Sequence, residues 1–264
     1  MLTERLEKAR EAFLKKDIRE AKSAHTEAAI KRHLEEHRRG GRYIGDLVYG
    51  ALDGIITTFA VVSGVAGASL SSAIVLILGF ANLFGDGISM AIGNYLSTKS
   101  ESDFYKRERS REEWEVENYP KGEIAEIRGV YAKKGFKGKN LDRLVKIITS
   151  NKKVWLDTMM SEELGLIEET KTPIKSASST FFAFVIAGFT PLLPFVLSIA
   201  FPSFLAYAFI TSIILTFIVL FIVGAFRSYV THIEWWKSGL EMLIVGGLAA
   251  GVAYLVGFLL KGIA

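Results

Sequence analysis

The longest stretches without charged side chains divide the chain into segments of membrane-spanning length. Between residues 47 and 98 only Asp53 and Asp86 are charged, residues 176–226 carry no charge, and residues 240–264 carry only Glu241 and Lys261. A bilayer-spanning helix needs about 20 mostly apolar residues, so these stretches hold two, two and one spans. We predict an all-α integral membrane protein with spans at residues 47–68, 71–97, 180–201, 203–225 and 239–260.

The polar region between the second and third predicted spans has the periodicity of helices. We expect the second span to continue as a helix to about Glu117, where Pro120 and Gly122 form a turn. A second helix follows and ends at Gly135. Two further helices are predicted. The first is capped by Asn140, and the second is capped by Asn151 and ended by Gly165.

Lys and Arg residues predict the orientation of the chain in the membrane. There are 12 before the first span, 17 at residues 98–178 and 2 in the loop at 226–238, which together account for 31 of the 32. Because basic loops stay inside, we expect the N-terminus and residues 98–178 in the cytosol and the C-terminus outside. The predicted organisation is 1–45 as cytosolic amphipathic helices, 46–97 as spans one and two, 98–178 as a cytosolic helical domain, and 179–264 as spans three to five.

Composition narrows the chemistry further. Cysteine is absent, which excludes disulfides and thiolate metal sites. Glutamine is also absent and the polar parts are rich in Lys and Glu, a tendency of heat-loving organisms, so we expect a prokaryotic source. The net charge of +4 follows from the inside bias of basic residues and does not indicate nucleic-acid binding.

Polar side chains recur at four-residue spacing inside the first two predicted spans. Residues four apart lie on one face of a helix. The two acids in this set have no basic partner in any predicted span, and ionisable residues within membranes usually mark functional sites. We therefore interpret the set as an ion path rather than as acids buried for structural reasons. It comprises Asp53, Thr57, Asn82, Asp86 and Met90.

Small residues predict close helix packing and a homodimer. Gly85, Ser89 and Gly93 form a ridge beside the polar stripe of the second span, and such a ridge lets another helix approach closely. One subunit offers too few ligands for a partly dehydrated cation, and a two-fold axis doubles them. Gly247 and Gly251 in the fifth span fit packing either within one subunit or between two.

The predicted cytosolic domain contains a second pattern of acids. Two pairs of glutamates, each three residues apart, flank the predicted turn, and a helical hairpin brings them face to face; a Met-Met-x-x-Glu motif follows. Carboxylates suit hard cations and thioethers suit softer metals, so the mixture favours Fe²⁺, Co²⁺ or Zn²⁺. Any single glutamate here is typical of a solvated helix face. The predicted metal ligands are Glu112, Glu115, Glu123, Glu126, Met159, Met160 and Glu163.

Four motifs in order resemble the vacuolar iron transporter family, which comprises plant and fungal vacuolar iron importers and their prokaryotic relatives. They are "DGIITTFAVVSG", "GDGISMAIGNYLSTKSE", "VWLDTMMSEELGL" and "GFTPLLPF", and the similarity covers about residues 40–260. The resemblance implies a homodimer that exports Fe²⁺ and related ions from the cytosol in exchange for protons, with its path between the two first spans. It also implies that Asp53 and Met90 line the path, and that the seven residues above bind metal in the cytosol.

Two features depart from or extend this pattern. Plant members that resemble this chain carry a glutamate where Asn82 stands, and Asp86 is a candidate to supply that charge. The N-terminal region contains His25, His33 and His37, of which the last two are four residues apart and suited to clamp a metal. A solvated helix that packs on the cytosolic domain is the favoured interpretation of these histidines.

Together these patterns predict a proton-coupled exporter of divalent metal ions, chiefly Fe²⁺, in a prokaryotic cell membrane. Metal ions and protons are its expected partners in the bilayer, and no permanently bound cofactor is expected. Two alternatives remain open: an exporter of Mn²⁺, Co²⁺ or Zn²⁺ with the same architecture, and a membrane-anchored metal sensor. The sequence contains no nucleophile–base set, phosphate loop or HExxH motif, so we do not expect an enzyme.

Overall fold

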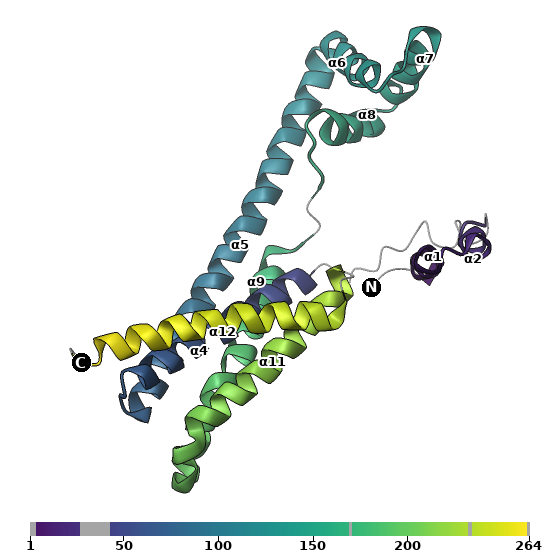
Figure 1. The fold of residues 1–264 in the computed structure, drawn as a ribbon. Helices are drawn as coiled ribbons and strands as arrows, with labels where there is room; N and C mark the ends of the chain where they lie inside the picture. Colours follow the sequence, from purple (N-terminus) through teal and green to yellow (C-terminus); the bar gives the residue numbers. More distant parts are fainter. Residues whose placement is uncertain (1–3, 27–42, 169–170, 232–233, 263–264) are drawn as a thin grey trace. The chain divides into compact units, whose positions relative to one another are not determined.

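The computed structural model describes residues 4–26, 43–168, 171–231 and 234–262, and all regular structure in these residues is helical. The chain divides into two compact units. We call Met1–Ala91 with Ser178–Ala264 the membrane unit, and Ile92–Ala177 the polar unit. Figure 1 shows their helices in the colours of the sequence.

Five helices in the described residues are long and apolar enough to cross a membrane, which confirms the predicted all-α fold with five spans. The long polar insertion between spans two and three is helical, as predicted. The span helices are α4 (Ile44–Gly67), α5 (Ser72–Asn118), Pro173–Ala200, Pro202–Ser228 and α12 (Trp235–Leu260).

The third span is an interrupted helix. It consists of α9 (Pro173–Gly188), the 3₁₀ turn η3 (Thr190–Leu192) and α10 (Leu193–Ala200). Pro191 and Pro194 lack the backbone N–H that an α-helix needs, which explains the break. The fourth span likewise starts with a 3₁₀ segment, η4 (Pro202–Tyr207), before α11 (Ala208–Thr231).

Glycines let other helices of the membrane unit approach α4 at backbone distance. A Cβ atom at Gly50 would lie 2.5 Å from the carbonyl oxygen of Thr180 on α9, and one at Gly188 would lie 2.7 Å from that of Gly54. Gly257 on α12 makes a still closer approach to the backbone of Gly64. Small residues therefore place α4, which carries Asp53, against both α9 and α12.

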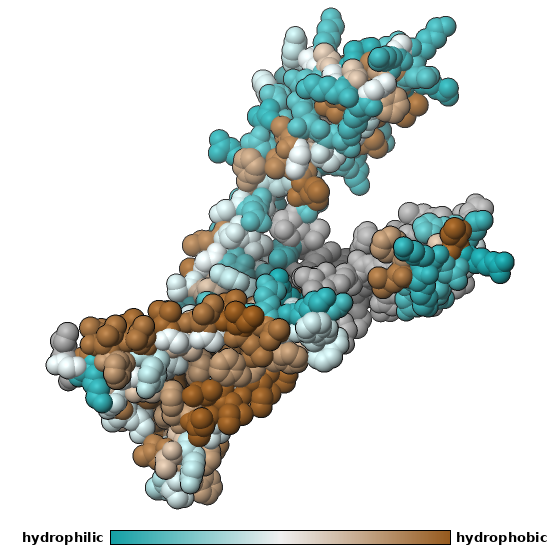
Figure 2. All heavy atoms as spheres, in the orientation of Figure 1, coloured by the Kyte–Doolittle hydropathy of each residue, from teal (hydrophilic) through white to brown (hydrophobic). Residues whose placement is uncertain are grey.

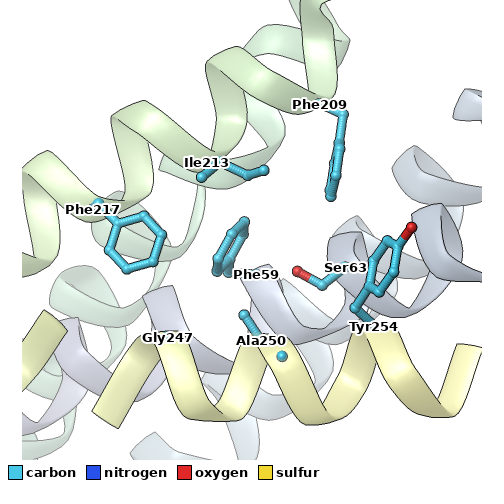
Figure 3. A pocket seen from close by; sticks show the side chains of 9 residues that line it. Phe59, Ser63, Phe209, Ile213, Phe217, Gly247, Ala250 and Tyr254 are labelled. Carbon is cyan, nitrogen blue, oxygen red and sulfur yellow. The ribbon is translucent and has the colours of Figure 1, made fainter. Parts of the chain in front are cut away.

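The membrane unit is apolar outside as well as inside. Its core includes Phe59, Phe184 and Leu192, and its surface over α11 and α12 is brown in Figure 2, as expected for helices that face lipid. A cavity of about 320 Å³ lies between α4, α11 and α12. Figure 3 shows that aromatic rings and Ser63 line it. No carboxylate, histidine or methionine is among the residues that line this cavity, so it lacks the side chains that most often bind divalent metal ions.

The same cavity bears on the fifth-span glycines. Gly247 and Gly251 both line it, and a Cβ atom at Gly247 would lie 3.5 Å from Phe217 of the same chain. A Cβ atom at Gly251 would meet nothing within 4 Å. Gly247 thus packs within the subunit, whereas Gly251 faces open space.

The polar unit is a small helical domain with its own core. It contains the C-terminal part of α5, α6 (Pro120–Lys133), α7 (Gly138–Thr149), α8 (Lys152–Thr158) and the π-helical turn η2 (Met159–Glu163). Its buried core residues are Val116, Ile127, Leu141, Val145, Ile148, Trp155, Leu156 and Met159. The surface of this unit is mostly teal in Figure 2.

Two local predictions in this unit need correction. The break after α5 is the single residue Tyr119, and Pro120 occupies the first turn of α6, where its missing N–H costs nothing. Asn140 does not cap the next helix, because α7 already begins at Gly138 after Lys137. The Asn151 side chain does cap α8 as predicted, by accepting a hydrogen bond from the Val154 N–H at 3.2 Å.

The other predicted helix stops are correct. Gly135 follows α6 with φ +97°, and Gly165 follows η2 with φ +65°. Both values lie in the left-handed region, which glycine adopts without strain.

Before the membrane unit's first span, two short helices form an N-terminal pair. They are α1 (Glu4–Lys15) and α2 (Ile18–Ala24), joined at Asp17. The Asp17 carboxylate caps α2 by accepting a hydrogen bond of 2.8 Å from the Arg19 N–H. The histidines His33 and His37 lie outside the described residues.

Candidate metal centre

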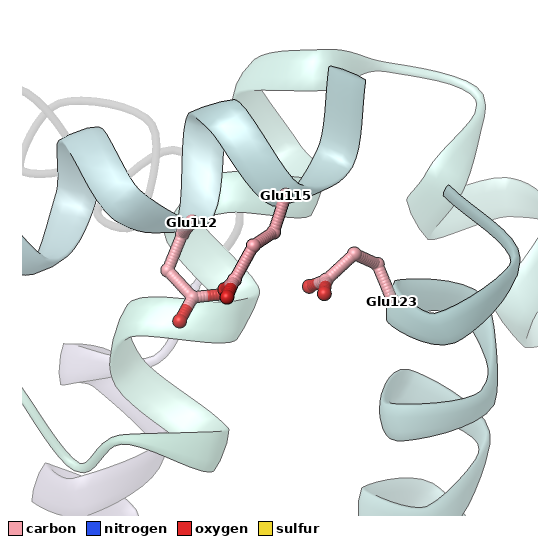
Figure 4. A group of neighbouring side chains, drawn as sticks. All are labelled: Glu112, Glu115 and Glu123. Carbon is pink, nitrogen blue, oxygen red and sulfur yellow. The ribbon is translucent and has the colours of Figure 1, made fainter. Parts of the chain in front are cut away.

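Three glutamates of the polar unit converge at the junction of α5 and α6. Glu112 and Glu115 project from the last turns of α5, and Glu123 projects from the first turn of α6 (Figure 4). One carboxylate oxygen of each lies within 4.8 Å of those of the other two. Because the break at Tyr119 is a single residue, the two helices stay close enough for side chains on either side of it to meet.

Two more carboxylates join this group. Glu126 is one turn after Glu123 on α6, and it lies near enough for its charge to act on both Glu123 and Glu163 of η2. η2 packs against α6, which brings the end of the Met-Met-x-x-Glu motif to the acids. The structure therefore gathers the predicted glutamates into one group, which we call the carboxylate cluster: Glu112, Glu115, Glu123, Glu126 and Glu163.

Burial makes this cluster electrostatically unfavourable without a cation. Glu112 is 2% exposed and Glu123 is 4% exposed, and the Oε2 atom of each has no hydrogen-bond partner among the described residues. A buried charged oxygen without a partner costs free energy. A divalent cation coordinated by these oxygens would supply both the missing charge and the missing bonds.

The crowding of acids also shifts their titration. Desolvation, followed by the charges of Glu126, Glu112 and Glu115, raises the pKa of Glu123 to about 7. Desolvation, followed by the charge of Glu126, raises the pKa of Glu163 to about 7 as well. Near neutral pH this cluster therefore holds protons that a cation has to displace.

The two predicted thioether ligands lie in the π-helical turn beside the cluster. Met159 is 0% exposed and Met160 is 1% exposed, and Met159 belongs to the core of the polar unit. A π-turn widens the helix locally and is frequent at functional sites. Met160 is not among the residues of this hydrophobic core.

Ion pairs around the cluster join the helices that carry it. Arg109 of α5 contacts Asp157 of α8 at 2.7 Å, and Lys152 of α8 contacts Glu113 of α5 at 2.7 Å. Lys134, just after α6, pairs with Glu162 of η2. These pairs join α5 to α8 and the end of α6 to η2, and none of them involves an acid of the cluster.

One basic residue does reach the cluster, and the sequence interpretation did not single it out. The guanidinium of Arg111 contacts Glu112 and Glu115, each at 2.7 Å. The sequence contained a sign of this contact, because an arginine four residues before a predicted ligand, here Glu115, lies on the same helix face.

In the membrane unit, a short hydrogen-bond chain joins the two helices of the predicted path. Asn82 of α5 donates from Nδ2 to the Thr57 hydroxyl at 3.3 Å, and Thr57 donates to the Asp53 carbonyl oxygen at 2.8 Å. Asp86, one turn after Asn82, is exposed, whereas Asp53 and Met90 are half-buried. The structure thus brings Asp53, Thr57 and Asn82 together, and Asp86, although exposed, lies near enough to Asp53 for the two charges to interact.

A further acid lies on the same face of α4. Asp46 is 9% exposed and stands seven residues, or two turns, before Asp53. The sequence interpretation treated it only as the boundary of the first span. Its spacing of seven residues from Asp53 was the sequence feature that places both acids on one face of this helix.

Two other polar residues have local structural roles. Asn94, in the polar unit, accepts a hydrogen bond from the Ser176 hydroxyl at 3.2 Å and so joins α5 to α9. The ring Nδ1 of His25 lies 2.8 Å from the carbonyl oxygen of Ala21, at the end of its own helix.

Comparisons with known proteins agree with this architecture. The model of the VIT family matches residues 44–258. The chain is 39% identical over 260 residues to the vacuolar iron transporter of Plasmodium berghei, covering 96% of this chain and 95% of that one. It is 38% identical to the vacuolar iron transporter of Toxoplasma gondii, covering 97% and 88%, and 35% identical to vacuolar iron transporter 1 of Arabidopsis thaliana, covering 85% and 89%. The chain therefore belongs to the VIT family, a family of membrane transporters rather than of enzymes.

Proposed function

We propose that this protein transports Fe²⁺ out of the cytosol in exchange for protons. The observation that carries the proposal is the carboxylate cluster, in which two buried acids keep an oxygen without a partner. Relatives that cover nearly the whole chain are named vacuolar iron transporters, which supports iron as the metal.

On this proposal the polar unit captures the ion and the membrane unit moves it. The cluster supplies carboxylate oxygens, and Met159 and Met160 supply the thioethers that favour Fe²⁺ over a hard ion such as Mg²⁺. Residues 98–178 form the cytosolic metal-binding domain. The iron is cargo and leaves the protein at the end of each cycle.

Asp53 is the proposed site of exchange between metal and protons. A carboxylate binds either a cation or a proton, so the two compete for one site, which is the minimum requirement for antiport. Thr57 and Asn82 orient the helix face around Asp53 through their hydrogen bonds. Met90 and Asp86 continue the same stripe on α5.

The proposed functional form is a homodimer. One side of α5 carries Gly85, the exposed Asp86 and Gly93. A Cβ atom at either glycine would meet nothing within 4 Å of this chain. An acid exposed on a membrane helix is costly in lipid. A second copy of the chain against this face covers that acid and doubles the ligands of the path.

Transport assays on proteoliposomes test the proposal. The protein is reconstituted and offered Fe²⁺ under anaerobic conditions, then Mn²⁺, Co²⁺ and Zn²⁺, each with and without a pH gradient. We expect Fe²⁺ uptake that is faster when the inside of the vesicles is acidic. Metal binding without flux would instead identify a membrane-anchored sensor, and faster flux of another ion would change the assigned cargo. The cell membrane is the proposed location in a prokaryotic host, and fractionation of host cells tests it.

A further inference from the structure

The three nitrogen atoms of one guanidinium each contact a different carboxylate of α5. In Arg111, Nη2 lies 2.7 Å from Glu112, Nη1 lies 2.7 Å from Glu115 and Nε lies 3.0 Å from Glu108. Such charge-assisted contacts are stronger than neutral hydrogen bonds, and the planar fork of arginine suits them.

Two of these three partners are members of the carboxylate cluster. Glu112 is the most buried of its acids, with Oε1 bonded to Arg111 and Oε2 without a partner. Glu115 contributes an oxygen to the group that lies within 4.8 Å of Glu123. A cation that binds this group therefore competes with Arg111 for both glutamates.

The contacts of Arg111 do not hold the fold together. All three partners lie on α5, within four residues of Arg111, so these contacts join no second helix to α5. Arg109 differs, because its partner Asp157 lies on α8 and the pair joins two helices. Arg111 is also 45% exposed at its side chain, so it has room to swing away into solvent.

We propose that Arg111 is a built-in counter-cation of the carboxylate cluster, which an incoming divalent ion displaces and which returns when the ion leaves. It lowers the affinity of the cluster for metal and hastens release toward the membrane path. This inference rests on the proposed function, since it assigns regulation to the same metal site. Its chemical class of ligand is a divalent cation that takes carboxylate oxygens.

The experiment measures Co²⁺ binding to the full-length protein in detergent micelles by calorimetry and by the visible absorption of the bound ion. Co²⁺ is stable in air, and its absorption reports the ligand set. The variants are Arg111→Gln, Arg111→Lys and, as a control, Arg107→Gln. Arg107 is an exposed residue one turn earlier on α5, so its loss removes the same charge from the same helix.

We expect Arg111→Gln to bind Co²⁺ about tenfold more tightly than wild type, because the charge-assisted contacts no longer compete. Arg111→Lys should fall between the two, since lysine keeps the charge but lacks the fork. Arg107→Gln should change affinity by less than about threefold, because exposed charges are screened. The absorption spectrum should be the same in wild type and Arg111→Gln, because the ligands do not change.

Several results would overturn the inference. They are unchanged or weaker binding in Arg111→Gln, an equal gain in Arg107→Gln, and an altered spectrum in Arg111→Gln. A wild-type protein that binds no more Co²⁺ at the cluster than a variant with Glu112, Glu115, Glu123 and Glu126 all changed to Gln would refute the proposed metal site itself, and the inference with it. The two failures are therefore distinguishable.

Discussion

Asn82 of α5 donates a hydrogen bond of 3.3 Å to the hydroxyl of Thr57 on α4. The Thr57 hydroxyl proton is already committed to the carbonyl oxygen of Asp53 at 2.8 Å, so it can only accept from Asn82. The amide of Asn82 therefore lies beside the turn that carries Asp53. The resemblance to plant members predicts a glutamate at this position. On the proposed function, we therefore expect proton coupling in this chain to depend mainly on Asp53.

The first prediction is that Asp53→Asn abolishes metal-driven proton movement. Asparagine keeps the shape and polarity of the side chain but exchanges no proton, so it separates a coupling role from a capping role. We expect Fe²⁺ added under anaerobic conditions to change the internal pH of wild-type liposomes and to leave that of Asp53→Asn liposomes unchanged. Gel filtration should show that the variant still folds.

Asp86→Asn is the matched control for this experiment, because it removes an acid from the neighbouring helix of the same unit. It should retain a proton response, although a reduced one. If Asp53→Asn responds like wild type and Asp86→Asn does not, the coupling acid is Asp86.

The second prediction concerns metal capture by the carboxylate cluster. Changing Glu112, Glu115, Glu123 and Glu126 together to Gln should abolish stoichiometric Fe²⁺ or Zn²⁺ binding at the polar unit of the full-length protein. Each single change should weaken binding less, because the remaining oxygens can rearrange around the ion. Calorimetry provides the measurement. Undiminished binding in the fourfold variant would show that the ligands lie elsewhere. Glu101→Gln with Asp103→Asn is the control, because it alters two exposed acids of α5 outside the cluster.

The third prediction is that metal binding weakens as the pH falls. Glu123 and Glu163 each have a pKa raised to about 7, so both are mostly ionised at pH 8 and mostly protonated at pH 6. A metal ion binds the ionised form and releases the protons. If both acids bind metal, affinity should be about 100-fold lower at pH 6 than at pH 8, because each competing proton contributes about tenfold.

Titrations with Zn²⁺ at pH 6, 7 and 8 check this dependence, with Glu123→Gln as the comparison. That variant lacks one titrating group, so its affinity should depend less steeply on pH. An affinity that stays constant between pH 6 and pH 8 would contradict the assignment of these acids as ligands.

The fourth prediction separates the thioethers from the carboxylates. Met159→Leu and Met160→Leu conserve volume, and such exchanges in a core usually cost less than about 1.5 kcal/mol of stability. The double variant should bind Fe²⁺ and Co²⁺ more weakly while its affinity for Mn²⁺ changes little, because a thioether adds little for a hard ion. Equal losses for all three ions would point to distortion of the site rather than to loss of sulfur ligands.

The fifth prediction tests the dimer face on α5. A Cβ atom at Gly85 would meet nothing within 4 Å of its own chain, so we expect a leucine there to leave the subunit undisturbed. If α5 faces a second copy across this surface, Gly85→Leu should convert the dimer to a monomer and abolish flux. Light scattering in mild detergent gives the mass.

Gly251→Leu on α12 is the comparison, since that glycine also faces open space. Loss of the dimer in Gly251→Leu with retention in Gly85→Leu would move the contact to α12. A wild-type protein that is monomeric and still transports would refute the dimer altogether.

The sequence alone predicts those parts of the architecture that depend on neighbouring residues. The five spans follow from the lengths of its charge-free stretches, because bilayer thickness sets the length of a spanning helix. The capping of α8 by Asn151 and the stops at Gly135 and Gly165 depend on a few adjacent residues, and these predictions were correct. The sequence also predicts the glutamate pairs of α5 and α6, because three-residue spacing on a helix places two side chains on one face.

Only the tertiary structure decided which of these local pieces meet. The predicted hairpin brings Glu123 to Glu112 across the one-residue break at Tyr119, whereas no local spacing indicated the packing of η2 on α6 that brings Glu163 to Glu126. The start of α7 at Gly138, ahead of Asn140, and the break of the third span at its prolines are local features that the predictions missed. The packing of η2 on α6 is different, because it depends on contacts between residues far apart in the chain. The free energies of such contacts are set by the burial and charge of partners that no local spacing specifies.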